Sequence, residues 1–421
     1  MENKQTAAPI LSRKQIAAVA AGNALEFYDF LIFGFFAVPI SAAFFPAGSP
    51  TTSLLRTLAI FGVGFLTRPL GGILIGPLGD RVGRKPAMLL SFGLMGFTII
   101  GMALTPSYAS IGIAAPLLAV VFRLLQGFAL GGEVGPTTAF LMEAAPPEKR
   151  GRYVSIQLAT QYAATLTAGI VGVLLSSLLS PENLVSWGWR AAMLLGAAVV
   201  PFALVIRRNL PETFARQAGV KPPAMTRAQL NLSLLMLMMA AAGTIASYTL
   251  ISLNIFATQT LGLTQAQAFG AAATAGLSGA VAAPVGGWLS DRLGRKPVMI
   301  AAFALLCAIV VPCFMLMTQS RTSMALYGSA TLMTLLLALG TPASLAFLSE
   351  NLPPHLRSGG IGIIYAVAIA LFGGTAAFVV TWLTAVTHSP LAPGWYMCGA
   401  LLVGLCAMLA VRESAPVKTG G

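Results

Sequence analysis

Charged residues are scarce in this chain of 421 residues. They make up 9% of it, whereas a soluble globular protein has roughly a quarter. Hydrophobic residues make up 57%, and the mean hydropathy is +0.84. This number of charges is too small to cover the surface of a soluble protein. Much of the apolar surface must therefore face lipid. The composition excludes a soluble fold and predicts a membrane protein.

Cysteine and histidine are also rare, with four and two copies. The cysteines lie inside apolar stretches without metal-ligand spacing, so we expect no disulfide, no metal and no cofactor. The apolar stretches hold no histidine, which argues against an intramembrane enzyme. A Gly-x4-Gly-Lys-Ser/Thr phosphate loop is absent, so nothing suggests that nucleotide hydrolysis supplies energy. These absences leave an ion gradient as the energy source.

Long stretches without charge alternate with short basic loops. No charged residue lies between Lys85 and Arg123, between Arg227 and Asp291, or between Arg357 and Arg412. Each gap is long enough for a pair of membrane-spanning helices of about 20 residues. We predict twelve spans, near residues 15–42, 54–79, 87–105, 114–142, 153–179, 188–207, 229–259, 266–289, 298–318, 325–348, 359–386 and 395–412.

An internal repeat divides these spans into two sets of six. The pattern Gly-x3-Asp-Arg-x-Gly-Arg-Lys-Pro occupies Gly76–Pro86 and recurs 211 positions later in Gly287–Pro297. A second pattern, Glu-x2-Pro-Pro-x2-Arg, occupies Glu143–Arg150 and recurs in Glu350–Arg357. Because six is even, both copies lie on one membrane side, which indicates parallel repeats. We predict an N-terminal six-helix bundle over residues 1–206, a linker over 207–228 and a C-terminal six-helix bundle over 229–421. The fold class is thus an all-α membrane protein with two pseudo-symmetric bundles.

The basic residues predict the orientation. If the chain starts inside the cell, 20 of its 25 basic residues fall on the inner side, and only Arg56, Arg190 and Arg321 fall outside. This asymmetry predicts that both termini are cytoplasmic. The net charge of +13 is therefore a topology signal, and we expect a lipid bilayer but no nucleic acid among the partners.

Five charged residues lie inside predicted spans: Glu26, Asp29, Arg68, Arg123 and Glu133. A charge at the bilayer centre costs roughly 2.5 kcal/mol or more, so such residues are candidates for function. Helical spacing places Asn23 with the first two acids on one stripe, and Gln126 with Arg123 and Glu133 on another. The next span adds Gln157 and Gln161. Spans of the C-terminal half carry no charge, and their candidate cavity residues are Tyr248, Asn254 and Tyr365.

The residue types suggest a division of roles. We assign Arg68 and Arg123 to substrate carboxylates, because a guanidinium stays charged and offers bidentate donors. Glu26, Asp29 and Glu133 are the candidates for proton coupling, since a carboxylate can gain and lose a proton. We expect Asp29 to pair with Arg123. The alternative is that these charges form ion pairs that only hold helices together.

The chain resembles a known transporter family through these motifs. The paired Gly-x3-Asp-Arg-x-Gly-Arg-Lys loops are similar to the signature of the major facilitator superfamily. Four further segments resemble its metabolite:proton symporters: Gly22–Phe30, Phe65–Pro69, Arg123–Glu133 and Trp187–Arg190. Phe372–Gly374 and Pro393–Ala400 are most similar to the citrate and tricarballylate branch, although Phe27-Tyr28 and Pro136 depart from that branch.

The resemblance implies a carrier that alternates access to a central site. We expect a monomer in a bacterial inner membrane that imports a di- or tricarboxylate with protons, with Na+ coupling not excluded. The alternative is a proton symporter of the same fold for a zwitterion, such as betaine or proline, or for an aromatic acid such as shikimate. The departures at Phe27-Tyr28 and Pro136 leave the choice between these substrate classes open.

The duplicated loops are expected to form a cytoplasmic gate, which the resemblance implies is a latch. The residues assigned to it are Gly76, Asp80, Arg81, Gly83, Arg84, Glu143, Arg150, Asp291, Arg292, Arg295, Glu350 and Arg357. We expect Asp80 and Asp291 to favour the positive ends of the helices that begin after Pro86 and Pro297. The alternative is that these loops only determine topology.

Overall fold

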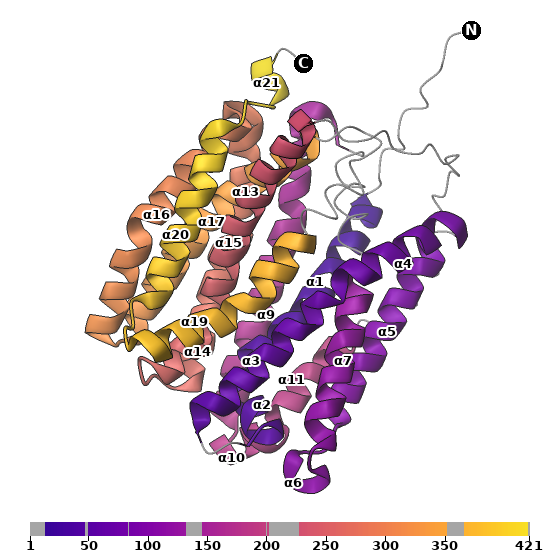
Figure 1. The fold of residues 1–421 in the computed structure, drawn as a ribbon, viewed down its shortest axis with the longest axis vertical. Helices are drawn as coiled ribbons and strands as arrows, with labels where there is room; N and C mark the ends of the chain where they lie inside the picture. Colours follow the sequence, from indigo (N-terminus) through magenta and orange to yellow (C-terminus); the bar gives the residue numbers. More distant parts are fainter. Residues whose placement is uncertain are drawn as a thin grey trace.

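The computed structural model describes residues 13–46, 49–82, 84–131, 145–198, 200–201, 227–351 and 366–419. Within these ranges, residues 13–21, 26, 76–82, 84–88 and 228 are described by their backbone only. Helices account for nearly all of the described chain, and they run in one general direction as two groups (Figure 1). The helices of the first half are drawn from indigo to magenta, and those of the second half from rose-red through orange to yellow.

The first half contains the helices α1 (Arg13–Phe35), α2 (Ala37–Phe44), α3 (Pro50–Leu66), α4 (Arg68–Val82), α5 (Arg84–Leu104), α6 (Tyr108–Ile111), α7 (Ala114–Gly131), η1 (Pro147–Lys149), α9 (Arg150–Leu178), α10 (Pro181–Asn183), η2 (Leu184–Gly188) and α11 (Trp189–Gly196). The second half contains α13 (Arg227–Ile251), α14 (Leu253–Gln259), α15 (Gln265–Leu293), α16 (Arg295–Ser320), α17 (Ser323–Glu350), η3 (Ile369–Gly373), α19 (Gly374–Thr387), α20 (Ala392–Ala410) and α21 (Pro416–Thr419).

Each of the twelve predicted spans overlaps a described helix or broken helix. Nine helices in the described part of the chain are long and apolar enough to cross a membrane. The pair α1 and α2, bent by 63°, would be a tenth, and Leu89–Leu104 is a shorter apolar helix. The predicted spans 114–142, 188–207 and 359–386 extend beyond the described residues, as does most of the predicted linker 207–228. The proposed boundaries of the two halves remain a prediction.

Prolines explain two breaks in the spans of the first half. The turn at Phe36 separates α1 from α2, and Thr67 separates α3 from α4. Pro39 and Pro69 follow these breaks, and each lacks the N–H that a helix would use to bond the carbonyl four residues earlier. Pro39 therefore leaves the Phe35 carbonyl without its usual intrahelical donor, whereas at the second break the backbone N–H of Thr67 donates to the Phe65 carbonyl.

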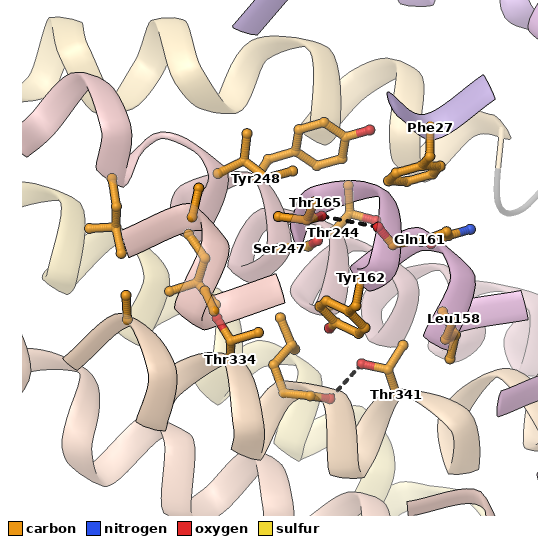
Figure 2. A pocket seen from close by; sticks show the side chains of 18 of the residues that line it. Phe27, Leu158, Gln161, Tyr162, Thr165, Thr244, Ser247, Tyr248, Thr334 and Thr341 are labelled. Atoms are coloured by element: carbon orange, nitrogen blue, oxygen red, sulfur yellow. Dashed lines mark hydrogen bonds between the residues drawn. The ribbon is translucent and has the colours of Figure 1, made fainter. Parts of the chain in front are cut away.

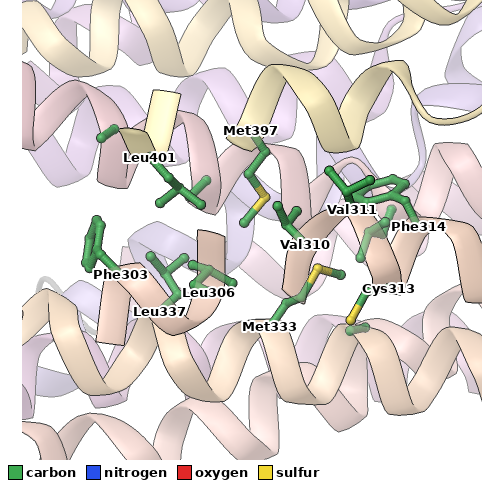
Figure 3. Close-up of a cluster of buried hydrophobic side chains, with 14 of the residues drawn as sticks. Phe303, Leu306, Val310, Val311, Cys313, Phe314, Met333, Leu337, Met397 and Leu401 are labelled. Carbon is green, nitrogen blue, oxygen red and sulfur yellow. The ribbon is translucent and has the colours of Figure 1, made fainter. Parts of the chain in front are cut away.

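Large apolar side chains cover the outside of the helices and also fill their cores. Ile73, Leu178 and Met324 are 65%, 78% and 83% exposed, as expected of surfaces that face lipid. Inside the second half, buried side chains of α16, α17 and α20 interdigitate, and Figure 3 shows part of this cluster. Since lipid is as apolar as these side chains, close van der Waals packing is what holds such helices together.

The two halves meet along α9 and α15, which lie side by side (Figure 1). Glycines allow the close approach: a Cβ on Gly287 would lie 2.4 Å from the carbonyl oxygen of Gly151. A second contact joins α3 to α19. We call the end of the molecule that holds Asp291 and Arg295 the motif end, at the top of Figure 1, and the end near α6 and α10 the opposite end.

Candidate functional site

A cavity of about 130 Å³ lies between the two halves. α9 contributes Gln161 and Tyr162, α13 contributes Ser247 and Tyr248, and α14 contributes Asn254 to its wall. Figure 2 shows the side chains of Gln161 and Tyr162 from the first half near those of Ser247 and Tyr248 from the second half. All of the described residues that line the cavity are uncharged. The described part of its wall is therefore largely apolar, with aromatic and neutral polar side chains and no fixed charge.

The predicted charged residues form a separate cluster inside the first half. The Gln126 side chain links two of them: its Nε2 donates to Asp29 Oδ2, and its Oε1 accepts from Arg123 Nη1. All three residues are buried, with exposed fractions of 4%, 0% and 3% for Gln126, Asp29 and Arg123. The expected pairing of Asp29 with Arg123 is therefore indirect, through an amide. Asp29 Oδ1 and Arg123 Nε have no hydrogen-bond partner in the described structure.

Aromatic rings surround the two arginines. The Arg68 guanidinium lies 4.5 Å from the centre of the Phe65 ring and 5.1 Å from that of Phe30. Arg123 lies 5.9 Å from the centre of Phe30. Such cation–π contacts stabilise a buried guanidinium without neutralising it. Phe30 and Phe65 also contact Tyr248, at 5.8 and 5.7 Å between ring centres, so these rings connect the arginines to the cavity wall.

Asn23 holds α1 against α9. Its Nδ2 donates to the Gln157 carbonyl oxygen at 3.2 Å and to Thr160 Oγ1 at 2.9 Å. Asn23 and Gln157 are both buried, and neither lines the cavity. In this conformation these contacts join helices within the first half.

The cavity therefore contains three of the predicted substrate residues, Gln161, Tyr248 and Asn254. The other described ones lie outside its wall: Asn23, Arg68, Arg123, Gln126 and Gln157. Tyr365 and Glu133 fall outside the described residues, and Glu26 is described by its backbone in α1 only. The rings of Phe30 and Phe65 were not predicted, because an aromatic residue in an apolar span gives no signal that distinguishes it from core.

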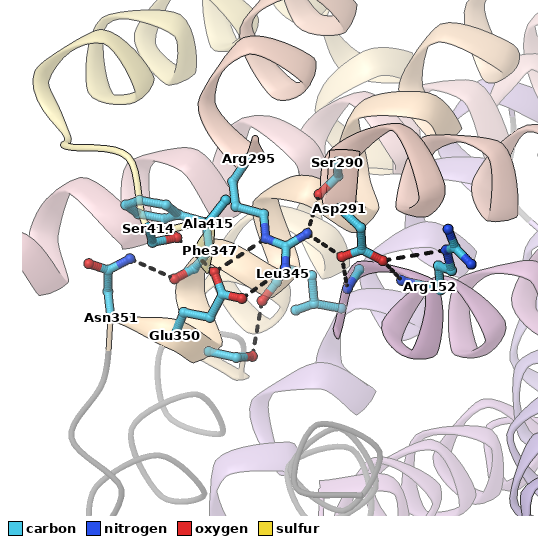
Figure 4. A network of polar contacts seen from close by, with 12 residues as sticks. Arg152, Ser290, Asp291, Arg295, Leu345, Phe347, Glu350, Asn351, Ser414 and Ala415 are labelled. Carbon is cyan, nitrogen blue, oxygen red and sulfur yellow. Dashed lines mark hydrogen bonds and ion pairs between the residues drawn. The ribbon is translucent and has the colours of Figure 1, made fainter. Parts of the chain in front are cut away.

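A network of charged residues occupies the motif end, shown in Figure 4. Asp291, at the end of α15, accepts hydrogen bonds from the backbone N–H groups of Gly151 at 2.8 Å and Arg152 at 3.0 Å, in the first turn of α9. Arg295 Nη1 lies 2.6 Å from Asp291 Oδ1, and Arg295 Nη2 lies 2.9 Å from Glu350 Oε1. Arg295 is fully buried, so both carboxylates compensate its charge.

The prediction for the partner of Asp291 was wrong. We expected it to favour the start of the helix that begins after Pro297, but its carboxylate binds the N-terminus of α9 in the other half. That position is favourable because unpaired N–H groups and the helix dipole attract an anion. α16 itself begins at Arg295, before Pro297.

Glu413 binds the N-terminus of α16 instead, and sequence reasoning missed it. Its carboxylate accepts hydrogen bonds from the backbone N–H groups of Arg295 and Lys296, both at 2.9 Å. Burial acts to raise the pKa of Glu413, but the backbone donors of Ala415, Lys296, Arg295 and Ser414 outweigh it and hold the pKa below its ordinary value. The only feature of the sequence that could have indicated this cap is an acidic residue just after the last span.

Other predicted gate residues are placed only in part. Arg292 lies over the Trp288 ring at 4.3 Å and is not in the network around Arg295. Arg150 is the first residue of α9. The remaining members, Gly76, Asp80, Arg81, Gly83, Arg84, Glu143 and Arg357, lie outside the described side chains. Their role stays a prediction.

Comparison with known proteins identifies the family. The family model described as Major Facilitator Superfamily matches residues 19–367 and 232–420. The chain belongs to the major facilitator superfamily. A citrate-proton symporter of Klebsiella pneumoniae is 34% identical over 93% of this chain and 90% of its own length. The alpha-ketoglutarate permease of Escherichia coli is 33% identical over 86% of this chain and 85% of its own length.

Solved structures support the same major facilitator fold. A partially occluded, inward-open structure of the xylose transporter XylE from Escherichia coli superposes with a TM-score of 0.76. It covers 96% of this chain and 98% of the other, at 15% identity. The prediction of twelve transmembrane helices in two six-helix bundles is thereby confirmed. In the part of the chain that the structure describes, no three His, Cys, Asp or Glu residues lie together in a possible metal site.

Proposed function

We propose that this protein imports a di- or tricarboxylate of the citrate or tricarballylate type together with protons, by alternating access. The observation that carries the proposal is the pair of buried arginines, Arg68 and Arg123, beside a cavity between the two halves. The relatives named as citrate-proton symporter and alpha-ketoglutarate permease support the same class of substrate.

The buried charge favours an anion. Among the described side chains of this cluster, two guanidiniums accompany one carboxylate, that of Asp29. Arg68 has cation–π contacts but no recorded hydrogen bond or ion pair to another described residue, which leaves its donors available to a carboxylate. Because Phe30 and Phe65 contact both Arg68 and Tyr248, a movement of these rings would open the arginines to the cavity.

Asp29 is our candidate for proton coupling, with Glu26 and Glu133 as the other two. Its Oδ1 has no hydrogen-bond partner in the described structure, so a proton can bind there without breaking an existing bond. Protonation would remove the charge that now attracts the Gln126 and Arg123 pair. The arginine would then be freer to bind a substrate carboxylate, which links proton uptake to substrate uptake.

The motif network serves as the gate on one side of the membrane. Asp291 connects α15 to the N-terminus of α9, so the two halves cannot separate at the motif end while these bonds exist. The basic residues of this end favour a cytoplasmic position for it, and we propose a bacterial inner membrane with both termini inside. Labelling of single cysteines near either terminus in intact cells tests this orientation, and reaction with an impermeant reagent would refute it.

Uptake by the purified protein in proteoliposomes tests the function. Radiolabelled citrate, tricarballylate, succinate, shikimate and betaine are offered under a pH gradient and, separately, under a Na+ gradient. We expect accumulation of a di- or tricarboxylate that depends on the pH gradient. Uptake of betaine or shikimate without any di- or tricarboxylate uptake would overturn the substrate class, and accumulation driven only by Na+ would overturn the coupling ion.

Three conservative variants test the coupling residues: Asp29→Asn, Glu26→Gln and Glu133→Gln. Each removes one titratable carboxyl and keeps its shape and polarity. We expect at least one variant to exchange substrate across the membrane but to lose accumulation against a gradient. Undiminished pH-driven accumulation in all three would show that none of these carboxylates carries the proton.

A further inference from the structure

Two thiols from different helices face each other in the second half. Cys307 Sγ, on α16, lies 3.6 Å from Cys398 Sγ, on α20. Both cysteines are free, and they are 91 residues apart in the sequence, so their spacing gave no sign of a joint site. Neither lines the cavity between the two halves. The pair is therefore a dithiol that the proposed transport site does not use.

The dithiol lies at the border between the core and the lipid-facing surface. Each cysteine is half-buried and follows a fully buried core residue, Leu306 on α16 and Met397 on α20 (Figure 3). Each is also followed by an exposed small residue, Ala308 and Gly399. A Cβ on Gly399 would meet nothing within 4 Å, so no large side chain covers this position. The surroundings leave room for a small apolar molecule to approach from the lipid.

The depth of the site restricts what can reach it. Cys307 is close to the middle of α16, which runs from Arg295 to Ser320. At 1.5 Å per residue it lies about 20 Å from either end of that helix, within the hydrocarbon part of a bilayer. Charged species are costly at this depth. A partner of the dithiol must therefore be neutral and soluble in lipid.

The separation of the two sulfurs favours a single bridging atom. A disulfide requires about 2.05 Å between them. An atom bound linearly through two bonds of about 2.3 Å, the length of a Zn–S bond, requires about 4.6 Å. Bonds of this length that meet at about 100° span the observed 3.6 Å without movement of either helix. The geometry fits an atom with a bent, pyramidal or tetrahedral arrangement of ligands.

A structural metal ion does not fit this site. A tetrahedral zinc ion takes four ligands, and in the described part of the chain no third His, Cys, Asp or Glu joins the two thiols. The bridging atom must therefore carry its remaining substituent with it. A trivalent arsenic atom with one carbon substituent meets this requirement, because two sulfurs complete its three bonds.

We propose that Cys307 and Cys398 form a modification site for lipid-soluble, monosubstituted trivalent arsenicals. Two S–H bonds and two As–OH bonds break, two As–S bonds form, and the two thiol hydrogens leave with the hydroxyls as two molecules of water. Arsenic stays trivalent, so no oxidant is needed, and all reactants and products are neutral. The product links α16 to α20 within one half of the protein. This site is independent of the proposed transport function.

Mass spectrometry of the full-length protein, treated with phenylarsine oxide in proteoliposomes, tests the proposal. We expect wild type to gain one phenylarsenic group and to lose two hydrogen atoms. Because the second bond forms within the complex, displacement should need roughly 100-fold more of the monothiol mercaptoethanol than displacement from a single thiol. The dithiol dimercaptopropanol should remove the group. No gain in mass, or release by the monothiol as easily as from a single thiol, would overturn the site.

Single variants identify the two sulfurs. Cys307→Ser and Cys398→Ser each leave one thiol of the pair and should lose the monothiol-resistant adduct. The double variant Cys313→Ser, Cys406→Ser keeps the pair and is the matched control, so it should retain the adduct. If a serine variant does not fold, alanine replaces the same cysteine. A resistant adduct in either single variant, or its loss in the control, would refute the assignment.

Thermal stability and reagent charge give two further readouts. The bridge joins residues 91 positions apart, so it restricts the unfolded chain and should raise the melting temperature of wild type and of the control, but not of the single variants. A phenylarsine oxide that carries a sulfonate group, and so does not enter the bilayer, should leave the pair unmodified in proteoliposomes. Equal modification by this charged reagent would overturn the position of the site in the lipid.

Discussion

Asp291→Asn is the substitution that should most directly open the motif end. The carboxylate accepts two backbone N–H groups from the first turn of α9, in addition to its contact with Arg295. An asparagine has one acceptor oxygen, so one of the two inter-bundle bonds is lost and the other is no longer charge-assisted. A hydrogen bond to a charged group contributes about 1.5–3 kcal/mol, and the N-terminal dipole of α9 adds to it. We expect a loss of about 2 kcal/mol, which changes the ratio of open to closed protein roughly 30-fold.

Spin labels at the exposed residues Glu148 and Arg412 report this change, because they lie on opposite halves at the motif end. Glu350→Gln is the matched control: it also removes a partner of Arg295, but both residues belong to the second half. It should lower thermal stability without separating the labels. An unchanged label distance in Asp291→Asn, or an equal separation in Glu350→Gln, would refute the assignment of the gate to Asp291.

Three further predictions concern single positions. Gly287→Ala places a Cβ 2.4 Å from a backbone oxygen of α9, so it should lower both the melting temperature and uptake; Gly328→Ala, which meets nothing within 4 Å, should do neither. Arg123→Lys keeps the charge but loses bidentate geometry, so it should raise the KM for carboxylate uptake while the protein stays folded; an unchanged KM would remove it from the site. Glu413→Gln should weaken the cap of α16 by roughly 1 kcal/mol at pH 7. Because the folded pKa of Glu413 is lowered, its contribution is present above the ordinary value of 4.5 and is lost as pH falls through the folded value, so the difference in melting temperature from wild type should disappear there.

The spans were predictable because each depends on a local property, an apolar run long enough to cross a bilayer. The grouping of Asp29, Arg123 and Gln126 was also accessible, since helical spacing places the last two on one face and a buried charge needs a partner. Spacing does not reveal that the amide of Gln126 lies between the two charges, because this depends on the distance between α1 and α7.

Contacts between distant segments were the part that the sequence could not supply. Asp291 precedes a predicted helix start, which made that start its expected partner, yet the N-terminus that it binds lies 140 residues away at Gly151. Asn254 was predicted to contact substrate, but nothing local indicates that its amide reaches the carbonyl of Phe35. Both contacts follow from how the two halves pack, which is set by many small residues along α9 and α15.

The two ends of the cavity are closed by different kinds of bond. At the motif end the closure is ionic and reaches the surface, with Arg152 44% exposed and 3.8 Å from Asp291. At the opposite end it includes the neutral amide of Asn254, which donates to the Phe35 carbonyl oxygen, together with aromatic rings and an apolar cluster in which Leu58 packs with Ile255. Dissolved salt screens exposed charges but has little effect on neutral, buried contacts. Raising the ionic strength should therefore weaken the Arg152–Asp291 contact and leave the buried Asp291–Arg295 pair and the opposite end largely unchanged, so the solution at the motif end can loosen one closure without loosening the other.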